Sequence, residues 1–154
     1  MFLMTKFWSK LRPLSKLDQL AETIIKTAFI LSEDHHVIAS YLNHTGANFK
    51  VENKKRGGEF DVLCRQICID KTTYTFISHN HLERGLRPDL LIGLVLFVDE
   101  QKPVKYLIPS TIWLTPSQLF TNSAVQHNEY GISVNKKTFA DLVEYEFDKQ
   151  ITLC

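Results

Sequence analysis

The chain has 154 residues, of which 44% are hydrophobic and 23% are charged, as expected for one soluble domain with a substantial core. Its 18 Lys and Arg residues nearly balance 17 Asp and Glu residues, so a net charge of +1 argues against a protein that coats polyanions over its whole surface, although a local basic patch stays open. Three cysteines, an odd number, fit a reducing cytoplasm, where we expect the protein to reside.

The N-terminal stretch MFLMTKFWSKLRP does not have the apolar core of a signal peptide, and no segment is long and apolar enough to predict a membrane span. Phe7 and Trp8 lie among basic residues, a pattern also found in membrane-surface anchors. We favour packing of these aromatic side chains on the body of the protein or on a partner chain. Residues 1–14 are therefore interpreted as an N-terminal extension of a single domain over 15–154.

The first half of the domain begins with helical signals. Ser15 and Asp18 are typical of a helix N-terminus, and apolar residues at helical spacing predict a helix over about 16–31. Ser32-Glu33-Asp34 predicts the cap of a second helix, which would end at Gly46. This second helix would carry Val37, Ile38, Tyr41 and Leu42.

The rest of the chain is predominantly β in character. Strands are predicted at 48–52, 60–69, 73–78, 90–98, 104–108 and 131–134, with Asp70-Lys71 joining the second and third as a hairpin. A helical turn is predicted at Thr115-Pro116-Ser117, and a last helix from Lys136 would place Phe139, Leu142, Val143 and Phe147 on one face. This order of elements predicts a mixed sheet with helices packed on it.

Residues 87–103, RPDLLIGLVLFVDEQKP, spell out the pattern PD-(D/E)xK of metal-dependent nucleases. Asp89 and Glu100 flank an almost unbroken apolar run, which predicts a strand buried on both faces. The rise of a strand would separate the two carboxylates by roughly 35 Å. Because metal ligands lie about 2–2.5 Å from the ion, we interpret this stretch as a core strand followed by a turn.

Other segments resemble the restriction-endonuclease-like (PD-(D/E)xK) superfamily and its small bacterial members. They are LAETIIKTA, GGEFDVLC, YTFISHN, LIGLVLFVDEQKPVKYLIPSTIW and the tail YGISVNKKTFADLVEYEF. The resemblance covers about residues 15–147 and concerns layout and local sequence. It implies an α/β (α+β) domain in which helices flank a central mixed β-sheet.

In this family a metal-binding aspartate begins the second strand, and E/Q-x-K lies on the next strand. The resemblance places Asp61 at the first position, whereas Ser78 replaces the acid or amide and Asn80 replaces the lysine. A two-residue turn at Asp70-Lys71 would pair Asp61 with Asn80. Side chains alternate along strands, so Asp61, Ser78 and Asn80 would then share one face.

Hydrolysis in this family needs Mg²⁺ or Mn²⁺ held by carboxylates, and positive charge near the reacting phosphate. Ser78 is a poor ligand for a hard cation and Asn80 has no charge, which favours an inactive site. The resemblance gives Glu22 as a helix-borne acid that would join Asp61 at the metal. His79 and His81, which titrate near neutral pH, are candidates to replace the lysine.

Two further patterns bear on function. Cys64-x₃-Cys68 and His79-x-His81 are too far apart in the expected hairpin for one zinc ion, so buried free cysteines are the favoured interpretation. Lys54, Lys55 and Arg56 form a basic loop before Asp61, and nucleic-acid phosphates are its expected partner, with Arg84 and Arg87 on the same face. A solvated polar loop explains these residues equally well.

Three functions therefore stay open. The first is a catalytically impaired restriction-endonuclease-like protein that binds nucleic acid or a protein partner, and the second is an active Mg²⁺- or Mn²⁺-dependent nuclease. Both predict that the basic loop and Asp61 share one cleft. The third is a protein-interaction module, which predicts an exposed apolar patch near Phe7, Trp8 or Trp113. Homo-oligomerisation is left open.

Overall fold

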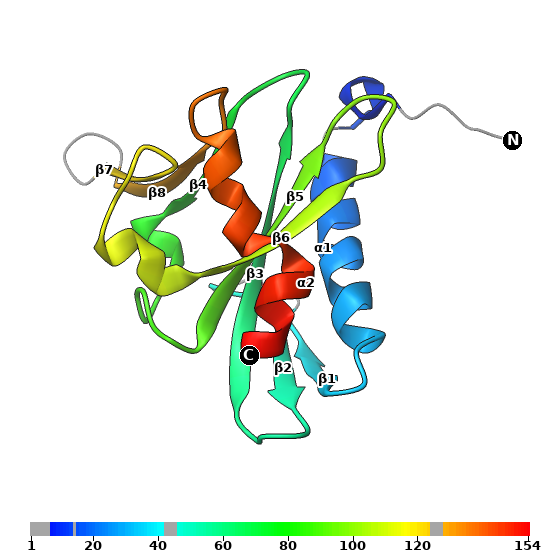
Figure 1. Ribbon diagram of the computed structural model, residues 1–154, viewed down its shortest axis with the longest axis vertical. Helices are drawn as coiled ribbons and strands as arrows, with labels where there is room; N and C mark the ends of the chain where they lie inside the picture. The colour runs from blue at the N-terminus through cyan, green and yellow to red at the C-terminus, as the bar shows by residue number, and fades with distance from the viewer. Residues whose placement is uncertain (1–6, 14, 42–45, 124–127) are drawn as a thin grey trace, which may run out of the picture.

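The computed structural model describes residues 7–13, 15–41, 46–123 and 128–154, which form two β-sheets with flanking helices (Figure 1). The α-helices are α1 (Ser15–Ile30) and α2 (Phe147–Gln150). Short 3₁₀ helices occur at η1 (Trp8–Lys10), η2 (His79–His81), η3 (Ser110–Leu114), η4 (Phe139–Tyr145) and η5 (Ile151–Leu153). The predicted combination of mixed β-structure and packed helices is confirmed.

The larger sheet has the strand order β1-β2-β3-β5-β6. Its strands are β1 (His35–Ser40), β2 (Phe49–Asn53), β3 (Glu59–Cys68), β5 (Leu90–Phe97) and β6 (Val104–Pro109). All neighbours are antiparallel except β3 and β5, which run parallel. Every residue of β5 is buried, which confirms the core strand predicted between Asp89 and Glu100.

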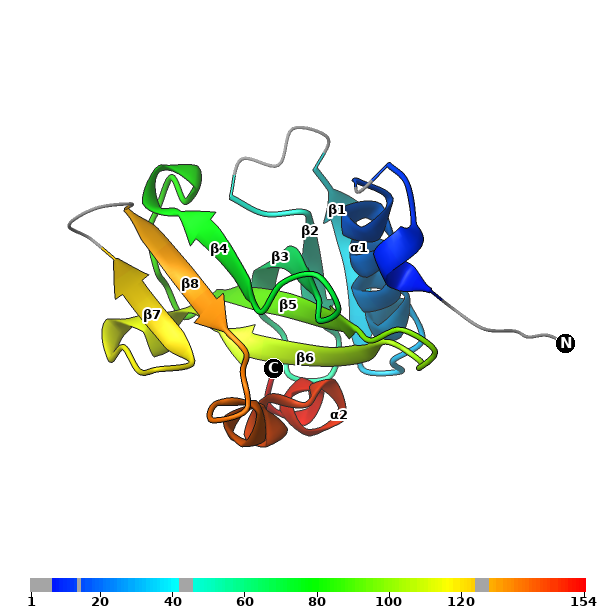
Figure 2. The ribbon, with the colours of Figure 1, turned by 90° about the horizontal axis from the view of Figure 1, so that it is seen from above.

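A smaller antiparallel sheet has the order β4-β8-β7, built from β4 (Tyr74–Ser78), β8 (Glu129–Ser133) and β7 (Phe120–Ser123). Figure 2 shows this sheet and α1 on opposite sides of β3 and β5. Two apolar clusters fill the layers. One contains Ile25 and Phe29 of α1, and the other contains Ile77 of β4 and Trp113 of η3.

The helix α1 lies very close to the central sheet. Its buried residues are Leu17, Ala21, Ile25 and Phe29, at the spacing of one helical face. A Cβ atom built on Gly93 of β5 would lie 2.9 Å from the Ile25 side chain, so glycine at this position permits the close approach.

The second helix predicted after Ser32 is wrong, because this segment is the edge strand β1. His35 of β1 pairs with Asn53 of β2, and Val37 pairs with Val51. Strand propensity of the β-branched Val37 and Ile38 agrees with this outcome. Ser32, the predicted cap of this helix, instead has its hydroxyl 2.7 Å from Nδ1 of the His35 ring. Leu42, also assigned to this helix, lies outside the described residues.

The predicted hairpin between residues 60–69 and 73–78 is also wrong. Both strands exist, but β4 pairs with β8, and β3 pairs with β2 and β5. Ile77 of β4 is 1% exposed whereas the adjacent Phe76 is 48% exposed. The alternation of buried and exposed residues in β4 therefore arises within the smaller sheet, without any pairing to β3. As a consequence, Asp61 does not face Asn80.

The C-terminal region differs in detail from its prediction. The last helix is the 3₁₀ helix η4 followed by α2, in which Leu142 and Phe147 are buried while Phe139 and Val143 are exposed. The helical turn expected at residues 115–117 lies earlier, in η3. Strand β7 was not predicted. Near the other end of the chain, the centroids of the Trp8 and Phe97 rings are 5.1 Å apart, whereas Phe7 is 44% exposed. The packing favoured for both aromatic side chains is therefore found for Trp8 alone.

Candidate functional site

Asp61 is a buried carboxylate on the central strand β3, with 7% of the residue exposed. Its neighbours Phe60 and Val62 belong to the apolar cluster around α1. Because side chains alternate along a strand, Asp61 points to the opposite face of the sheet. Burial of a charge requires paired partners, and Asp61 has them on both carboxylate oxygens.

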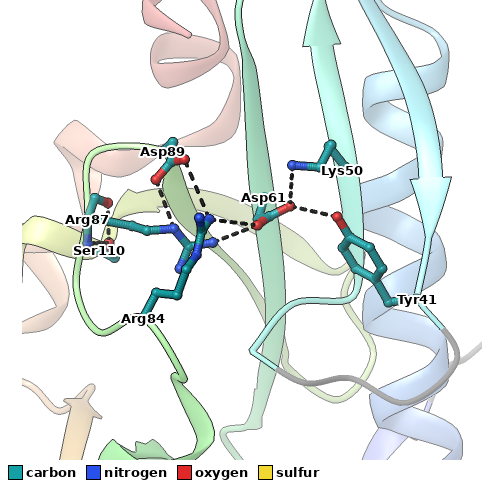
Figure 3. A network of polar contacts seen from close by, with 7 residues as sticks. All are labelled: Tyr41, Lys50, Asp61, Arg84, Arg87, Asp89 and Ser110. Atoms are coloured by element: carbon teal, nitrogen blue, oxygen red, sulfur yellow. Dashed lines mark hydrogen bonds and ion pairs between the residues drawn. The ribbon is translucent and has the colours of Figure 1, made fainter.

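Four donor groups surround the Asp61 carboxylate (Figure 3). The Tyr41 hydroxyl donates a hydrogen bond to Oδ1 at 3.0 Å, and Lys50 Nζ lies 3.2 Å from the same oxygen. Arg87 Nη2 donates to Oδ2 at 2.6 Å, and Arg84 Nη2 lies 4.0 Å from it. The strand pairing sets part of this geometry, since Lys50 of β2 is the cross-strand partner of Asp61.

The loop before β5 supplies the two arginines, and the rest of the fold holds this loop in place. Ser110 Oγ accepts a hydrogen bond from the Arg87 backbone N–H at 3.1 Å and donates one to the Arg87 carbonyl at 2.7 Å. Arg87 Nε lies 2.8 Å from Asp89 Oδ1, and Arg84 Nη2 lies 3.8 Å from Asp89 Oδ2. We name Tyr41, Lys50, Asp61, Arg84, Arg87 and Asp89 the Asp61 cluster.

The electrostatics of the Asp61 cluster favour the protonated forms of its donors. Burial, together with the hydrogen bond to Asp61, raises the pKa of Tyr41. Burial alone would lower the pKa of Lys50, but the hydrogen bond and charge of Asp61 outweigh burial and raise it. Tyr41 therefore stays a donor and Lys50 stays a cation at neutral pH.

A separate pocket of about 540 Å³, with both polar and apolar lining residues, lies between α1, β3 and β4. Its lining includes Glu22 of α1, Arg65 of β3, Ser78 of β4 and His81 of η2. Asn48, just before β2, also lines it and is 9% exposed. The volume is in the range of small-molecule sites.

Asn48 connects the two walls of this pocket. Its Nδ2 donates a hydrogen bond to Glu22 Oε1 at 2.6 Å, and its Oδ1 accepts one from the Cys64 backbone N–H at 2.8 Å. Further along β3, Gln66 Nε2 donates to Asp18 Oδ1 at 3.2 Å. Burial is the main reason that the pKa of the Cys64 thiol is raised, with the Glu22 charge adding to it. Cys64 is therefore a neutral thiol.

Arg65 lines the pocket together with residues of β4. Its Nε donates to the Phe76 carbonyl at 3.0 Å and its Nη1 donates to the Cys64 carbonyl at 2.9 Å. Burial lowers the pKa of Arg65, although an arginine remains charged. This guanidinium ties β3 to β4, which share no strand pairing.

The structure brings together some of the predicted site residues and separates others. Glu22, Ser78 and His81 line the pocket, whereas Asp61 lies in its own cluster with Arg84 and Arg87. The expected constellation of Asp61 with Glu22, Ser78 and Asn80 is therefore not formed. The physical reason is that Asp61 points away from α1, and β4 belongs to the other sheet.

Other predicted residues lie elsewhere. His79 and Asn80 are in η2, where the His79 ring lies 4.0 Å from the Tyr130 ring and 3.1 Å from Asn122 Oδ1. Lys54 and Lys55 are exposed in the β2–β3 loop.

Arg56 lies in the same loop, but its Nη2 donates to the carbonyls of Thr152 and Cys154. It lines a groove of about 410 Å³ with Glu59 and Asp89. Asp61 lines neither this groove nor the pocket beside Asn48, so neither of them is the expected cleft that holds both Asp61 and the basic loop. Over the described ranges, no group of three His, Cys, Asp or Glu side chains is arranged to hold a metal ion.

Sequence reasoning missed Tyr41, Lys50 and Asn48. A signal for two of them exists, because the Gly57-Gly58 turn could join 49–53 and 59–68 as an antiparallel pair. That pairing places Lys50 directly opposite Asp61 and Asn48 close to Cys64. The helix prediction for residues 32–46 obscured the role of Tyr41.

Within the parts of the chain that the structure describes, no helix has the length and apolar character needed to cross a membrane. Comparison of the chain with protein-family models, curated proteins and solved structures finds no match in any of the three.

Proposed function

We propose that this is a restriction-endonuclease-like protein that binds nucleic acid without hydrolysing it. Its layout supports the proposal, because α1 precedes three antiparallel strands, β1, β2 and β3, and β5 then runs parallel to β3. This is a central mixed sheet with flanking helices, as the family resemblance implies.

The observation that carries the proposal is the bridge that Asn48 makes between Glu22 and Cys64. Since residues 35–40 form a strand, the second strand of the domain is β2, and Asn48 immediately precedes it. The next strand, β3, presents Cys64 beside Asn48, and Gln66 follows two positions later. On this alignment Asn48 replaces the family's aspartate, and Cys64 and Gln66 replace E/Q and lysine.

These three replacements remove the groups that hydrolysis needs. Asn48 and Gln66 are neutral, and Cys64 is a buried neutral thiol, so Glu22 would be the one carboxylate of this set. Hard divalent cations prefer several oxygen ligands, with carboxylates prominent among them. Asp18 also lines the pocket, but its Oδ1 accepts the Gln66 amide. Glu22 with this one further carboxylate does not fit Mg²⁺ or Mn²⁺. Each lost electrostatic group commonly lowers the rate by about 10²–10³.

A second candidate function is metal-dependent cleavage centred on Asp61. The observation that favours it is Lys50 Nζ, which lies 3.2 Å from Asp61 Oδ1 on the adjacent strand. The family resemblance implies an aspartate and a lysine on neighbouring strands, with the lysine on the later strand. Here the order is reversed, because Lys50 lies on β2 and Asp61 on β3. Against it stands the occupation of both Asp61 oxygens by donor groups.

The test measures binding and cleavage in parallel. Fluorescence anisotropy would follow the binding of single- and double-stranded DNA and RNA, and gels would detect cleavage with Mg²⁺ or Mn²⁺. We expect binding without cleavage. Cleavage that Asp61→Ala abolishes would overturn the proposal in favour of the second candidate, and absence of binding to every nucleic acid would favour a protein-interaction role.

A gain-of-function variant sharpens the test. Asn48→Asp combined with Cys64→Glu and Gln66→Lys restores the charges of the family pattern. Isothermal titration should detect Mn²⁺ binding by this variant and none at the same site in the wild type. Because a buried glutamate at position 64 can prevent folding, Asn48→Asp alone is the companion variant, and Glu22→Gln in that background is its control.

A further inference from the structure

We infer that the Asp61 cluster is a phosphate-binding surface, on which Lys50 and Arg84 contact the phosphate and Asp61 is a positioning residue. The inference rests on the proposed function for its ligand, a nucleic-acid phosphodiester. It assigns to Asp61 a role other than metal binding. It also proposes where nucleic acid contacts the protein, which the pocket beside Asn48 does not indicate.

The charge of the cluster is the first argument. The cations Lys50, Arg84 and Arg87 converge on the carboxylates Asp61 and Asp89. In a chain with a net charge of only +1, this is a local concentration of cations from separate segments. The charge of Glu59 also acts on Lys50, so the formal charges of these six residues balance. Because Asp61 is buried while Arg84 and Lys50 reach solvent, a phosphate approaching this surface meets the cations first.

The burial of Asp61 is the second argument. Its side chain is 10% exposed, and its two oxygens already meet the donors of Tyr41, Lys50 and the arginines. A carboxylate so placed restricts the rotation of the cations around it, which reduces the entropy that a ligand must remove when it binds.

The exposure of the cations is the third argument. Arg87 is 16% exposed and anchors the loop, whereas the Lys50 side chain is 28% exposed and that of Arg84 is 65% exposed. The distances from Arg84 to Asp61 and Asp89 are long, at 4.0 and 3.8 Å. Most of the Arg84 side chain is therefore exposed to solvent, and its planar guanidinium suits the bidentate binding of phosphate oxygens.

A purely structural ion-pair network explains the same interactions in another way. It would tie β2, β3 and the loop of residues 82–89 together without any ligand. The two explanations differ in the effect of Arg84, because an exposed arginine with long ion pairs contributes little to stability. If the cluster binds phosphate, removal of the Arg84 side chain should weaken nucleic-acid binding; if the network is purely structural, it should not.

The test compares Arg84→Ala and Lys50→Gln with Lys71→Ala. Lys71 is exposed and follows β3 at the end opposite to Asp61, so its substitution removes the same charge away from the cluster. The logarithm of the DNA association constant is measured against the logarithm of salt concentration. We expect the slope of this plot to become shallower by about 1 for every phosphate that a cluster variant no longer binds. Lys71→Ala should leave the slope unchanged.

Asp61→Asn tests the positioning role in the same assay. It adds net positive charge, which by itself would strengthen phosphate binding. If Asp61 positions Lys50 and Arg84, the salt dependence should instead become shallower in protein that circular dichroism shows to be folded. Stronger binding with a steeper salt dependence would overturn the positioning role.

Inorganic phosphate is the second probe, followed through the arginine Nε–Hε resonances of the full chain. We expect the Arg84 resonance to shift with phosphate in the wild type and in Lys71→Ala, but less in Asp61→Asn. Equal DNA binding by Arg84→Ala, Lys50→Gln and Lys71→Ala would overturn the inference and leave the proposed function intact. A phosphate response without DNA or RNA binding would overturn the proposed function while the phosphate site itself stands.

Discussion

The Asn48 amide donates a hydrogen bond of 2.6 Å to the carboxylate of Glu22, and thereby joins α1 to the segment that leads into β2. The oxygen of the same amide accepts the Cys64 backbone N–H. A neutral side chain can serve both neighbours, since it offers a donor to one and an acceptor to the other. An aspartate at this position could serve Cys64 but would repel Glu22.

Asn48→Asp should therefore lower the free energy of unfolding by about 1–3 kcal/mol near pH 8. The loss should shrink by pH 4, where one of the two facing carboxyls takes up a proton and the repulsion disappears. Urea denaturation at both pH values checks this. Glu22→Gln in the Asn48→Asp background should recover most of the loss at pH 8. An equal loss at both pH values would show that repulsion is not the cause.

Asp61→Asn should destabilise the fold more than any other single substitution in its cluster. Removing one partner of a largely buried ion pair costs about 3–5 kcal/mol. We expect the lower part of this range here, because Arg87 keeps its pair with Asp89 while Lys50 and Arg84 reach solvent. Asp89→Asn is the matched control: the Asp89 side chain is 50% exposed, and exposed pairs contribute about 0–1 kcal/mol. Urea denaturation of both variants gives the comparison, and similar losses would contradict the central role of Asp61.

Tyr74 should stabilise the folded protein at neutral pH, and this contribution should be lost at strongly alkaline pH. Burial, followed by the hydrogen bond that it donates to Glu129 at 2.6 Å, raises the pKa of Tyr74 to about 12. A pKa raised by folding stabilises the protein fully below the ordinary tyrosine value of about 10, and this contribution is lost as the pH rises through the folded value.

The comparison of wild type with Tyr74→Phe measures this contribution. The wild type should be more stable by on the order of 1 kcal/mol at pH 9, and the difference should vanish as the pH approaches 12. Ultraviolet absorbance should also show one fewer late-titrating phenol in the variant. A stability difference that stays constant over this pH range would argue against the Glu129 hydrogen bond as its source.

The native cysteines should resist alkylation at pH 8. Burial raises the pKa of the Cys64 and Cys68 thiols, and that of Cys154 to about 11, so thiolate, the reactive form, is scarce in the folded protein. Iodoacetamide labelling followed by mass spectrometry should find little modification without denaturant and full modification in urea. Rapid labelling of Cys64 in the native protein would contradict its placement beside Asn48.

The local pattern of side chains was sufficient to predict several elements. The helical spacing of Leu17, Ala21 and Ile25 predicts α1, and the uninterrupted apolar run from Leu90 predicts a strand buried on both faces. Both follow from burial of apolar surface at the period of the element that carries it, which neighbouring residues alone specify. The same reasoning correctly placed Asp89 and Glu100 on either side of this strand.

Tertiary structure decided which of these elements meet. Residues 35–40 carry both helix and strand signals, and pairing of His35 and Val37 with β2 selects the strand. Strand β4 could have paired with β3, but β8 offers Ile77 a buried position. Such choices depend on interactions between distant segments, which a short stretch of sequence does not encode.

The candidate sites show the same division most clearly. The sequence by itself determined that Asp61 begins a buried strand and that Glu22 lies on the first helix. Only the tertiary structure decided that these carboxylates lie in different polar clusters, with Asn48 beside Glu22 and Lys50 beside Asp61. The reason is that a polar group's chemistry depends on partners brought to it by strand pairing and helix packing, and these partners lie far away along the chain.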